Sequence, residues 1–144
     1  SGTTLCALAS NWGNTRVGGE RVTKVLIDSC GWVAAVDGGV NFDHALSSLV
    51  GTFEPVVLPQ VRKELQAVQE GRSKPLLLDL LDGRSEAVEP PEGMKHTDDQ
   101  LVAMAMENSW PVLTIDRALK QRLADAGCPF IEVVSGRTLR LIEF

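Results

Sequence analysis

The sequence predicts an α/β protein in which a mostly parallel sheet of about five strands has helices on both faces. Short runs rich in Val, Leu and Ile alternate along the chain with segments whose apolar residues recur at helical spacing. In the first run, residues 24–28, three consecutive apolar residues, Val25, Leu26 and Ile27, precede the final aspartate. Such a run is typical of a parallel strand that is buried on both faces.

The other elements follow in order from the same patterns. Residues 31–39 are rich in small residues and are expected to form a loop or short turn. Helices are predicted over residues 42–49, after an N-cap at Asn41, and over residues 60–69, 74–83, 98–107 and 118–126. Further strands are predicted over residues 54–59, 111–116, 130–134 and 138–144, with a loop over 83–97 and a turn at 135–136. Residues 1–21 have little periodicity and are assigned to an N-terminal extension, and residues 22–144 to one domain.

Composition and charge narrow the class of protein. The chain has 144 residues, 44% of them hydrophobic and 23% charged, as in an ordinary globular domain. No apolar run approaches the ~18 residues of a membrane span, and no basic residues precede the apolar stretch near the start, so we expect a cytoplasmic protein without membrane contact. Cys6, Cys30 and Cys128 are widely spaced, which indicates reduced thiols and no zinc site. The net charge of −5 means that a nucleic-acid partner needs a local basic patch.

Two aspartates end predicted parallel strands. Asp28 follows residues 24–27, and Asp116 ends residues 111–116 in the same way. Sites in open α/β sheets form outside the carboxyl ends of the strands. Both carboxylates therefore lie where a functional site is expected.

Two helical acids share the inward face of their helices. Glu64 lies three residues after Val61 and four before Val68 on an apolar stripe. Asp98 lies three residues before Leu101 and four before Val102, at the top of the apolar stripe of its helix. Each acid also has an ordinary structural explanation, since aspartate commonly caps helices and turns, although a glutamate on an apolar stripe is harder to explain as a cap.

Convergence of these four carboxylates would require a cation. Four like charges in one pocket repel one another, and an oxygen-rich set of ligands suits Mg²⁺ or Mn²⁺. Such an ion is the usual means of cutting phosphodiester bonds. Neither a phosphate-binding P-loop nor a dinucleotide-binding glycine motif is present in the sequence.

The segments that carry these acids resemble the successive blocks of a PIN domain. They are "VLIDSC", "FDHALSSLVG", "VVLPQVRKELQ", "HTDDQLVAMA" and "VLTIDRALKQRLADAGCPFI". The resemblance covers residues 22–144 and is closest to small archaeal PIN proteins related to rRNA-processing nucleases. It implies a three-layer α/β/α sandwich and Mg²⁺- or Mn²⁺-dependent cleavage of RNA.

The resemblance also implies roles for individual residues. Catalytic and metal-binding roles fall on Asp28, Glu64, Asp98 and Asp116, and supporting roles on Ser29, Asp99 and Thr114. The family usually has Asn where this chain has Cys30. A thiol is a weak hydrogen-bonding substitute for an amide, which puts the level of activity in doubt more than the fold.

Basic residues near the acids are the candidates for contacts with RNA. They are Arg62, Lys63, Lys95, Arg117, Lys120 and Arg122, and a solvated helix face explains them equally well. The sequence thus favours an endoribonuclease that acts in rRNA processing. The alternatives are a toxin of a toxin–antitoxin pair, a catalytically weak RNA- or protein-binding PIN module, and an unrelated α/β protein whose acids are caps. The expected partners are RNA, a second copy of the chain, and an antitoxin or a ribosome-assembly partner.

Overall fold

A computed structural model of the chain describes residues 14–17, 20–134 and 138–144. The helices are α2 (Ser29–Asp37), α3 (Phe42–Val50), α4 (Pro59–Glu70), α5 (Leu78–Arg84), α6 (Thr97–Asn108) and α7 (Arg117–Asp125). The strands are β1 (Asn14–Val17), β2 (Glu20–Ile27), β3 (Phe53–Val57), β4 (Glu86–Ala87), β5 (Val112–Leu113), β6 (Phe130–Val134) and β7 (Thr138–Ile142). The predicted turn at residues 135–136 lies outside the described residues.

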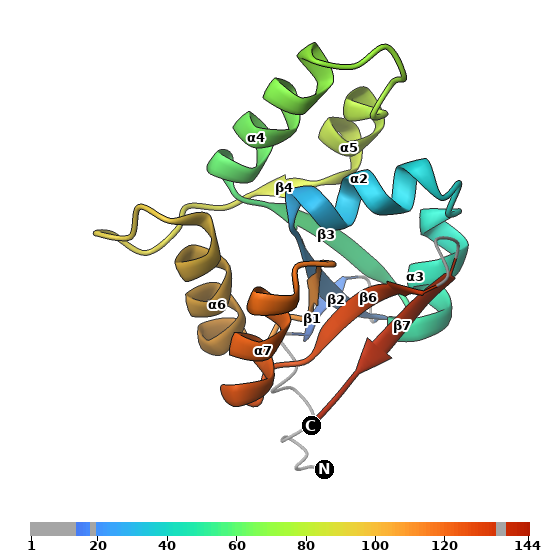
Figure 1. The fold of residues 1–144 in the computed structure, drawn as a ribbon. Coiled ribbons are helices and arrows are strands. Elements are labelled where there is room, and N and C mark those ends of the chain that lie inside the picture. Colours follow the sequence, from blue (N-terminus) through green and yellow to red (C-terminus); the bar gives the residue numbers. More distant parts are fainter. Residues whose placement is uncertain (1–13, 18–19, 135–137) are drawn as a thin grey trace.

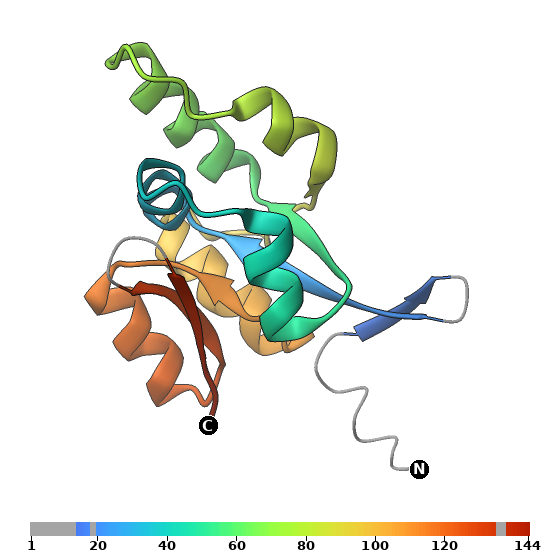
Figure 2. The ribbon, with the colours of Figure 1, turned by 90° about the vertical axis from the view of Figure 1, so that its right-hand side faces the viewer.

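The predicted α/β/α architecture is confirmed. In the described residues the strands run in the order β4-β3-β2-β5-β6-β7, and the first five of these are parallel to one another. Strand β7 is antiparallel to β6. Helices α2 and α3 lie on one side of the sheet and α6 and α7 on the other, while α4 and α5 form a pair beyond the end of β3 (Figures 1 and 2).

Part of the predicted extension pairs with the sheet. Of residues 1–21, residues 1–13 and 18–19 lie outside the described residues. Strand β1 runs antiparallel to β2, with Asn14 opposite Thr23 and Val17 opposite Glu20. Figure 2 shows this pair projecting from the body of the sheet.

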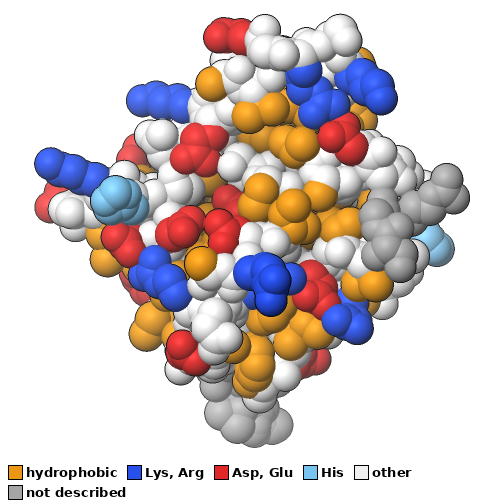
Figure 3. Space-filling model, viewed as in Figure 1, with side chains coloured by type: hydrophobic (Ala, Val, Ile, Leu, Met, Phe, Trp, Pro, Cys, Tyr) orange, Lys and Arg blue, Asp and Glu red, His pale blue; other side chains and the backbone are white. Residues whose placement is uncertain are grey.

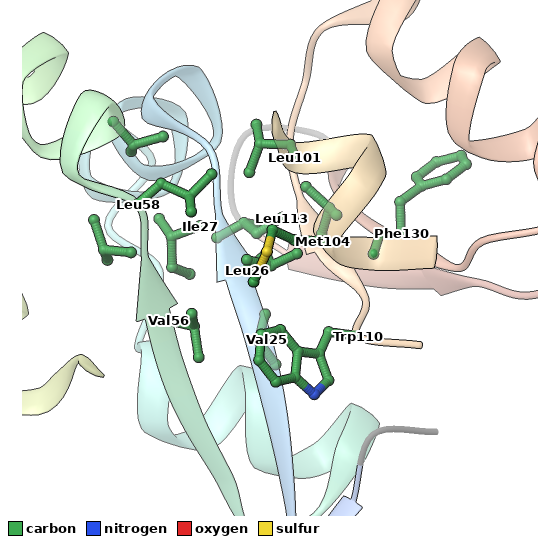
Figure 4. Packing of buried hydrophobic residues seen from close by; sticks show 14 of the residues in the cluster. Val25, Leu26, Ile27, Val56, Leu58, Leu101, Met104, Trp110, Leu113 and Phe130 are labelled. Carbon is green, nitrogen blue, oxygen red and sulfur yellow. The ribbon is translucent and has the colours of Figure 1, made fainter. Parts of the chain in front are cut away.

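The core forms around β2, as its apolar sequence predicts. Val25, Leu26 and Ile27 are at most 1% exposed, so the strand is buried on both faces. Figure 4 shows Val56 of β3 and Leu101 and Met104 of α6 around this strand, with Met104 beside Leu26. Among the described residues, every helix is too short or too polar to cross a lipid bilayer.

Helix α2 corrects the prediction of a loop over residues 31–39. The low helix propensity of Gly31 suggested a break, but its lack of a side chain serves packing. A Cβ at this position would lie 2.4 Å from the Leu113 carbonyl oxygen, so only glycine lets α2 approach β5 this closely. Trp32 anchors the same turn, because its ring is buried and its Nε1 donates to the Leu76 carbonyl at 2.8 Å.

Several element boundaries also differ from the sequence prediction; for example, β2 begins at Glu20 and not at residue 24. Helix α5 begins at Leu78 rather than at residue 74, since Leu77 has a left-handed backbone conformation with φ of 54°. The loop over residues 83–97 contains the short strand β4. Strand β5 stops at Leu113, and the chain then turns through Thr114 to Asp116 at the start of α7.

Candidate active site at the carboxyl edge of the sheet

The register of β2 and β5 brings two candidate residues together. Ile27 lies opposite Leu113, so the residues that follow these strands, Asp28 and Thr114, are neighbours. The Thr114 hydroxyl donates to Asp28 Oδ2 at 2.7 Å and accepts from the Asp116 amide at 3.1 Å. Both side chains are buried, with Asp28 only 5% exposed. Thr114 therefore links the two strand-terminal aspartates through one hydroxyl group.

Cys30 contacts the same carboxylate. Its thiol lies 2.9 Å from Asp28 Oδ2 and 3.5 Å from the Thr114 hydroxyl. Burial and the adjacent Asp28 carboxylate raise the pKa of this thiol, so at neutral pH it is protonated and can donate. Thus Cys30 occupies the place of the family's usual amide and makes a hydrogen bond of its own to Asp28.

Glu64 is held by hydroxyl groups from two other helices. It is half-buried on α4, next to the buried Leu65. Ser29, the first residue of α2, donates to Glu64 Oε1 at 2.9 Å. Thr97, the first residue of α6, donates to Glu64 Oε2 at 2.6 Å. The carboxylate is thereby fixed at the meeting point of three helices.

Asp98 lies within electrostatic range of the three other predicted acids. Burial raises its pKa first, and Asp116, Asp28 and Glu64 raise it further, while Arg122 opposes the shift. The four carboxylates named from the sequence thus face a common region. Figure 3 shows acidic side chains gathered left of the centre of this face, beside a histidine and a basic side chain.

The aspartates at the ends of the strands also cap helices. Asp116 Oδ1 accepts from the backbone amides of Ala118 and Leu119 at the start of α7. Asp28 Oδ1 accepts from the Ser29 amide at the start of α2. The structural explanation considered for these two acids is therefore correct as far as it goes. It does not cover Glu64, which lies in mid-helix. Asp98 is not the N-cap of α6, which is His96, but it lies in the first turn, where the helix dipole favours an acid.

The predicted supporting and RNA-binding residues have varied surroundings. Asp99 pairs with Arg122 of α7 at 2.8 Å, instead of joining the other acids. Arg62 is bound by both carboxylate oxygens of Asp82, at 2.7 and 2.9 Å. Lys120 pairs with Glu132 at 3.1 Å. Lys63, Lys95 and Arg117 are exposed, and of these Lys95 lines a groove beside the acids.

Thr97 was absent from the predicted site, and Arg122 was considered only as a basic residue that could contact RNA. Thr97 precedes two aspartates and reads in sequence as an ordinary start of a helix. Its contact with Glu64 joins residues 33 positions apart, which no local pattern reveals. Arg122 lies in a helix that carries several basic residues, and only its pairing with Asp99 distinguishes it.

The set of oxygen donors suits a hard divalent cation, but the side chains are not arranged around one. Four carboxylates and three hydroxyl groups face the region, and Arg122 is the cation that opposes the raised pKa of Asp98. In the part of the chain that the structure describes, no three His, Cys, Asp or Glu side chains are close enough to hold one ion as they stand.

Comparison with known proteins agrees with the fold. A family model described as "PIN like domain" matches residues 25–136. The structure of the PIN domain endonuclease Utp24 superposes with a TM-score of 0.69, covering 84% of this chain and 92% of that chain. The two sequences are 22% identical, so this likeness concerns the fold. No curated protein matches the chain.

Proposed function

This chain belongs to the PIN-like domain family, and on that premise we propose that it is a divalent-metal-dependent endoribonuclease. The observation that carries the proposal is the environment of Glu64. A mid-helix glutamate is held by Ser29 and Thr97 beside Asp98, whose pKa is raised by burial and then by Asp116, Asp28 and Glu64. A fold has no structural need for such an arrangement, because hydroxyl groups do not neutralise charge.

We assign the metal-binding and catalytic roles to Asp28, Glu64, Asp98 and Asp116. Carboxylate oxygens are the ligands that Mg²⁺ and Mn²⁺ prefer, and the mutual repulsion of these groups favours a cation among them. When bound, such an ion stabilises negative charge on a phosphodiester and lowers the pKa of water. Neighbouring side chains hold the carboxylates in place: Thr114 and Cys30 orient Asp28, and Ser29 and Thr97 orient Glu64.

For the cellular role we propose RNA processing of the rRNA type, as the sequence blocks suggest. A homodimer and a ribosome-assembly partner belong to the same proposal. A toxin role predicts growth arrest when the chain is expressed, together with a small antitoxin encoded beside it. Expression in a host with a tightly controlled promoter separates these two roles.

The test of the function is cleavage and metal binding measured on the same protein. Wild type should cut a labelled RNA in Mn²⁺ or Mg²⁺ and lose this activity in EDTA. Mn²⁺ at a hundred times its Kd should stabilise the fold by about 2.7 kcal/mol. The Asp98→Asn, Asp116→Asn double variant should lose both effects, and Asp125→Asn, an exposed acid on α7, should lose neither. No cleavage and no thermal shift in wild type would refute the proposal.

A second candidate function is a catalytically weak PIN module that binds RNA or protein. It is favoured by the hydrogen bonds from Thr114 and Cys30, which both use Asp28 Oδ2. It is also favoured by the spacing of the acids, of which no three among the described residues stand close enough to share an ion. In that case Mn²⁺ leaves the melting temperature unchanged while RNA or a protein partner still binds.

A further inference from the structure

Two shallow grooves meet beside the acids. The acid groove is lined by Glu64, Thr97 and Asp98, together with His96, Asp99 and Arg122. The methionine groove is lined by Met94, Lys95, Val102 and Met106, among others, and by the same His96, Asp99 and Arg122. Because three residues line both, the grooves form one continuous depression that starts at the candidate active site.

The methionine groove combines apolar and basic surface. Met94 is 38% exposed and Met106 is 59% exposed, so two flexible thioether side chains face solvent at its walls. Lys95 and His96 are exposed at the same groove. Its one lining carboxylate, Asp99, is paired with Arg122. A ligand with an apolar plane and a negative charge fits this combination.

The wall formed by residues 93–96 is fixed to α6. Gln100 is buried, and its Nε2 donates to the Met94 carbonyl oxygen at 2.9 Å. The His96 carbonyl accepts from the Gln100 amide at 3.1 Å. These two bonds hold the Met94 and His96 backbone beside the helix, so the groove is formed before any ligand arrives.

We propose that the methionine groove binds one unpaired base of a single-stranded RNA whose neighbouring phosphate lies in the acid groove. Met94 and Met106 pack against the base, His96 stacks on it, and Arg122 contacts a phosphate oxygen. The groove holds about 470 Å³, which is within the usual range of ligand pockets. The inference rests on the proposed ribonuclease function and adds a base-binding subsite to it, which takes an unpaired base because bases within a duplex cannot be splayed into such a groove.

The test compares two probes that carry the same charge. One is a nine-nucleotide oligouridine, and the other is a nine-unit ribose-phosphate chain without bases. Affinity is measured by fluorescence anisotropy at low salt in Ca²⁺, with gels to confirm that each probe stays intact. Wild type should bind the oligouridine about tenfold more tightly, as expected for one stacked base.

Variants then locate the base preference. The His96→Ala, Met106→Ala double variant should reduce the preference to twofold or less. Arg122→Gln should weaken both probes by the same factor, because it contacts phosphate and not base. Leu80→Ala is the matched control: it removes an apolar side chain on α5 whose exposure lies between those of Met94 and Met106 and which lines neither groove, and it should keep the full preference.

The outcomes distinguish this inference from the proposed function. Equal affinity of wild type for the two probes, binding of neither, or an undiminished preference in the double variant would overturn the groove assignment. Base preference without RNA cleavage in Mn²⁺ would support the groove assignment and contradict the proposed ribonuclease function. Cleavage without base preference would support the ribonuclease function and contradict the groove assignment.

Discussion

Glu64 and Glu132 are both partly buried glutamates, but their partners differ in charge. Glu132 on β6 binds Lys120 at 3.1 Å and is also bound by Arg140 of β7, whose Nε lies 2.9 Å away. Burial opposes ionisation of Glu132, yet these two cations lower its pKa. Glu64 has two hydroxyl donors and no ion pair among the described residues. The contrast separates a carboxylate that is neutralised by cations of the fold from one that, under the proposed function, binds a metal ion.

The largest expected effect comes from removing the charge of each glutamate in turn. Glu64→Gln should reduce RNA cleavage by about a hundredfold or more, because a group that stabilises the transition state is lost. Its melting temperature should stay near that of wild type, since an amide still bonds to the Ser29 and Thr97 hydroxyl groups. Glu132→Gln is the matched control and should cleave RNA normally. Normal cleavage by Glu64→Gln would remove the distinction between the two sites.

The hydroxyl group that fixes Glu64 should have the next largest effect. Thr97→Val keeps the shape of the side chain and removes the donor to Glu64 Oε2. Cleavage should fall by about tenfold, as for partners that orient a metal ligand. Thr97→Ser keeps the hydroxyl group and should restore most of the activity. Equal losses in the two variants would show that packing at this position matters and the hydrogen bond does not.

The free energy of unfolding should respond to the two substitutions in the opposite way from cleavage: Glu132→Gln should lower it, and Glu64→Gln should leave it nearly unchanged. Glu132→Gln leaves Lys120 and Arg140 without their anion and should cost about 1 kcal/mol of unfolding free energy, as for a partly exposed ion pair. This is measurable by denaturant unfolding at pH 7. Adding salt should narrow the difference between Glu132→Gln and wild type, because exposed charges are screened. If Glu132→Gln were as stable as wild type at low salt, the ion pairs of Glu132 with Lys120 and Arg140 would contribute nothing to stability.

The smallest effect concerns pH. Burial, and then Asp116, Asp28 and Glu64, raise the pKa of Asp98 in the fold, so the folded chain binds this proton more tightly than the unfolded chain does. The resulting stability is present below the unfolded value of about 3.9 and is lost as pH rises through the folded value. Asp98→Asn should therefore gain stability at pH 7, by less than about 1 kcal/mol because solvent screens the charge.

Asp99→Asn is the control for the pH experiment. It removes a charge from the same first turn of α6 and so the same interaction with the helix dipole, but this aspartate is paired with Arg122. We expect Asp99→Asn to lose stability at pH 7 where Asp98→Asn gains it. Near pH 3 the two variants should converge. A loss of stability in both at pH 7 would contradict the repulsion described for Asp98.

The sequence predicts the parts of the site that depend on regular geometry. Asp28 and Asp116 follow parallel strands, whose carboxyl ends necessarily lie at one edge of the sheet. Glu64 follows from helical spacing, because a period of 3.6 residues fixes which face it shares. These positions needed no knowledge of how the helices pack.

Contacts between elements could not be predicted in this way. Thr97 joins the site because α6 begins where α4 presents Glu64, and that distance depends on the packing of the whole core. Helix α2 was missed because Gly31 lowers helix propensity. The reason for a glycine at this position is its close contact with the backbone of β5, which the sequence does not reveal. The pairings of Arg62 and Lys120 with acids likewise come from side chains distant in sequence.

The contact between Gly31 and the Leu113 carbonyl has a consequence for how this protein can change. Position 31 carries no chemistry, yet a single methyl group there would push α2 away from β5. Asp28 and Ser29 lie at the start of that helix, so the displacement would move them away from Thr114 and Glu64. A substitution such as Gly31→Ala would thus disable the site without touching any polar atom. In a survey of random variants, this inert position should tolerate as little replacement as the acids themselves.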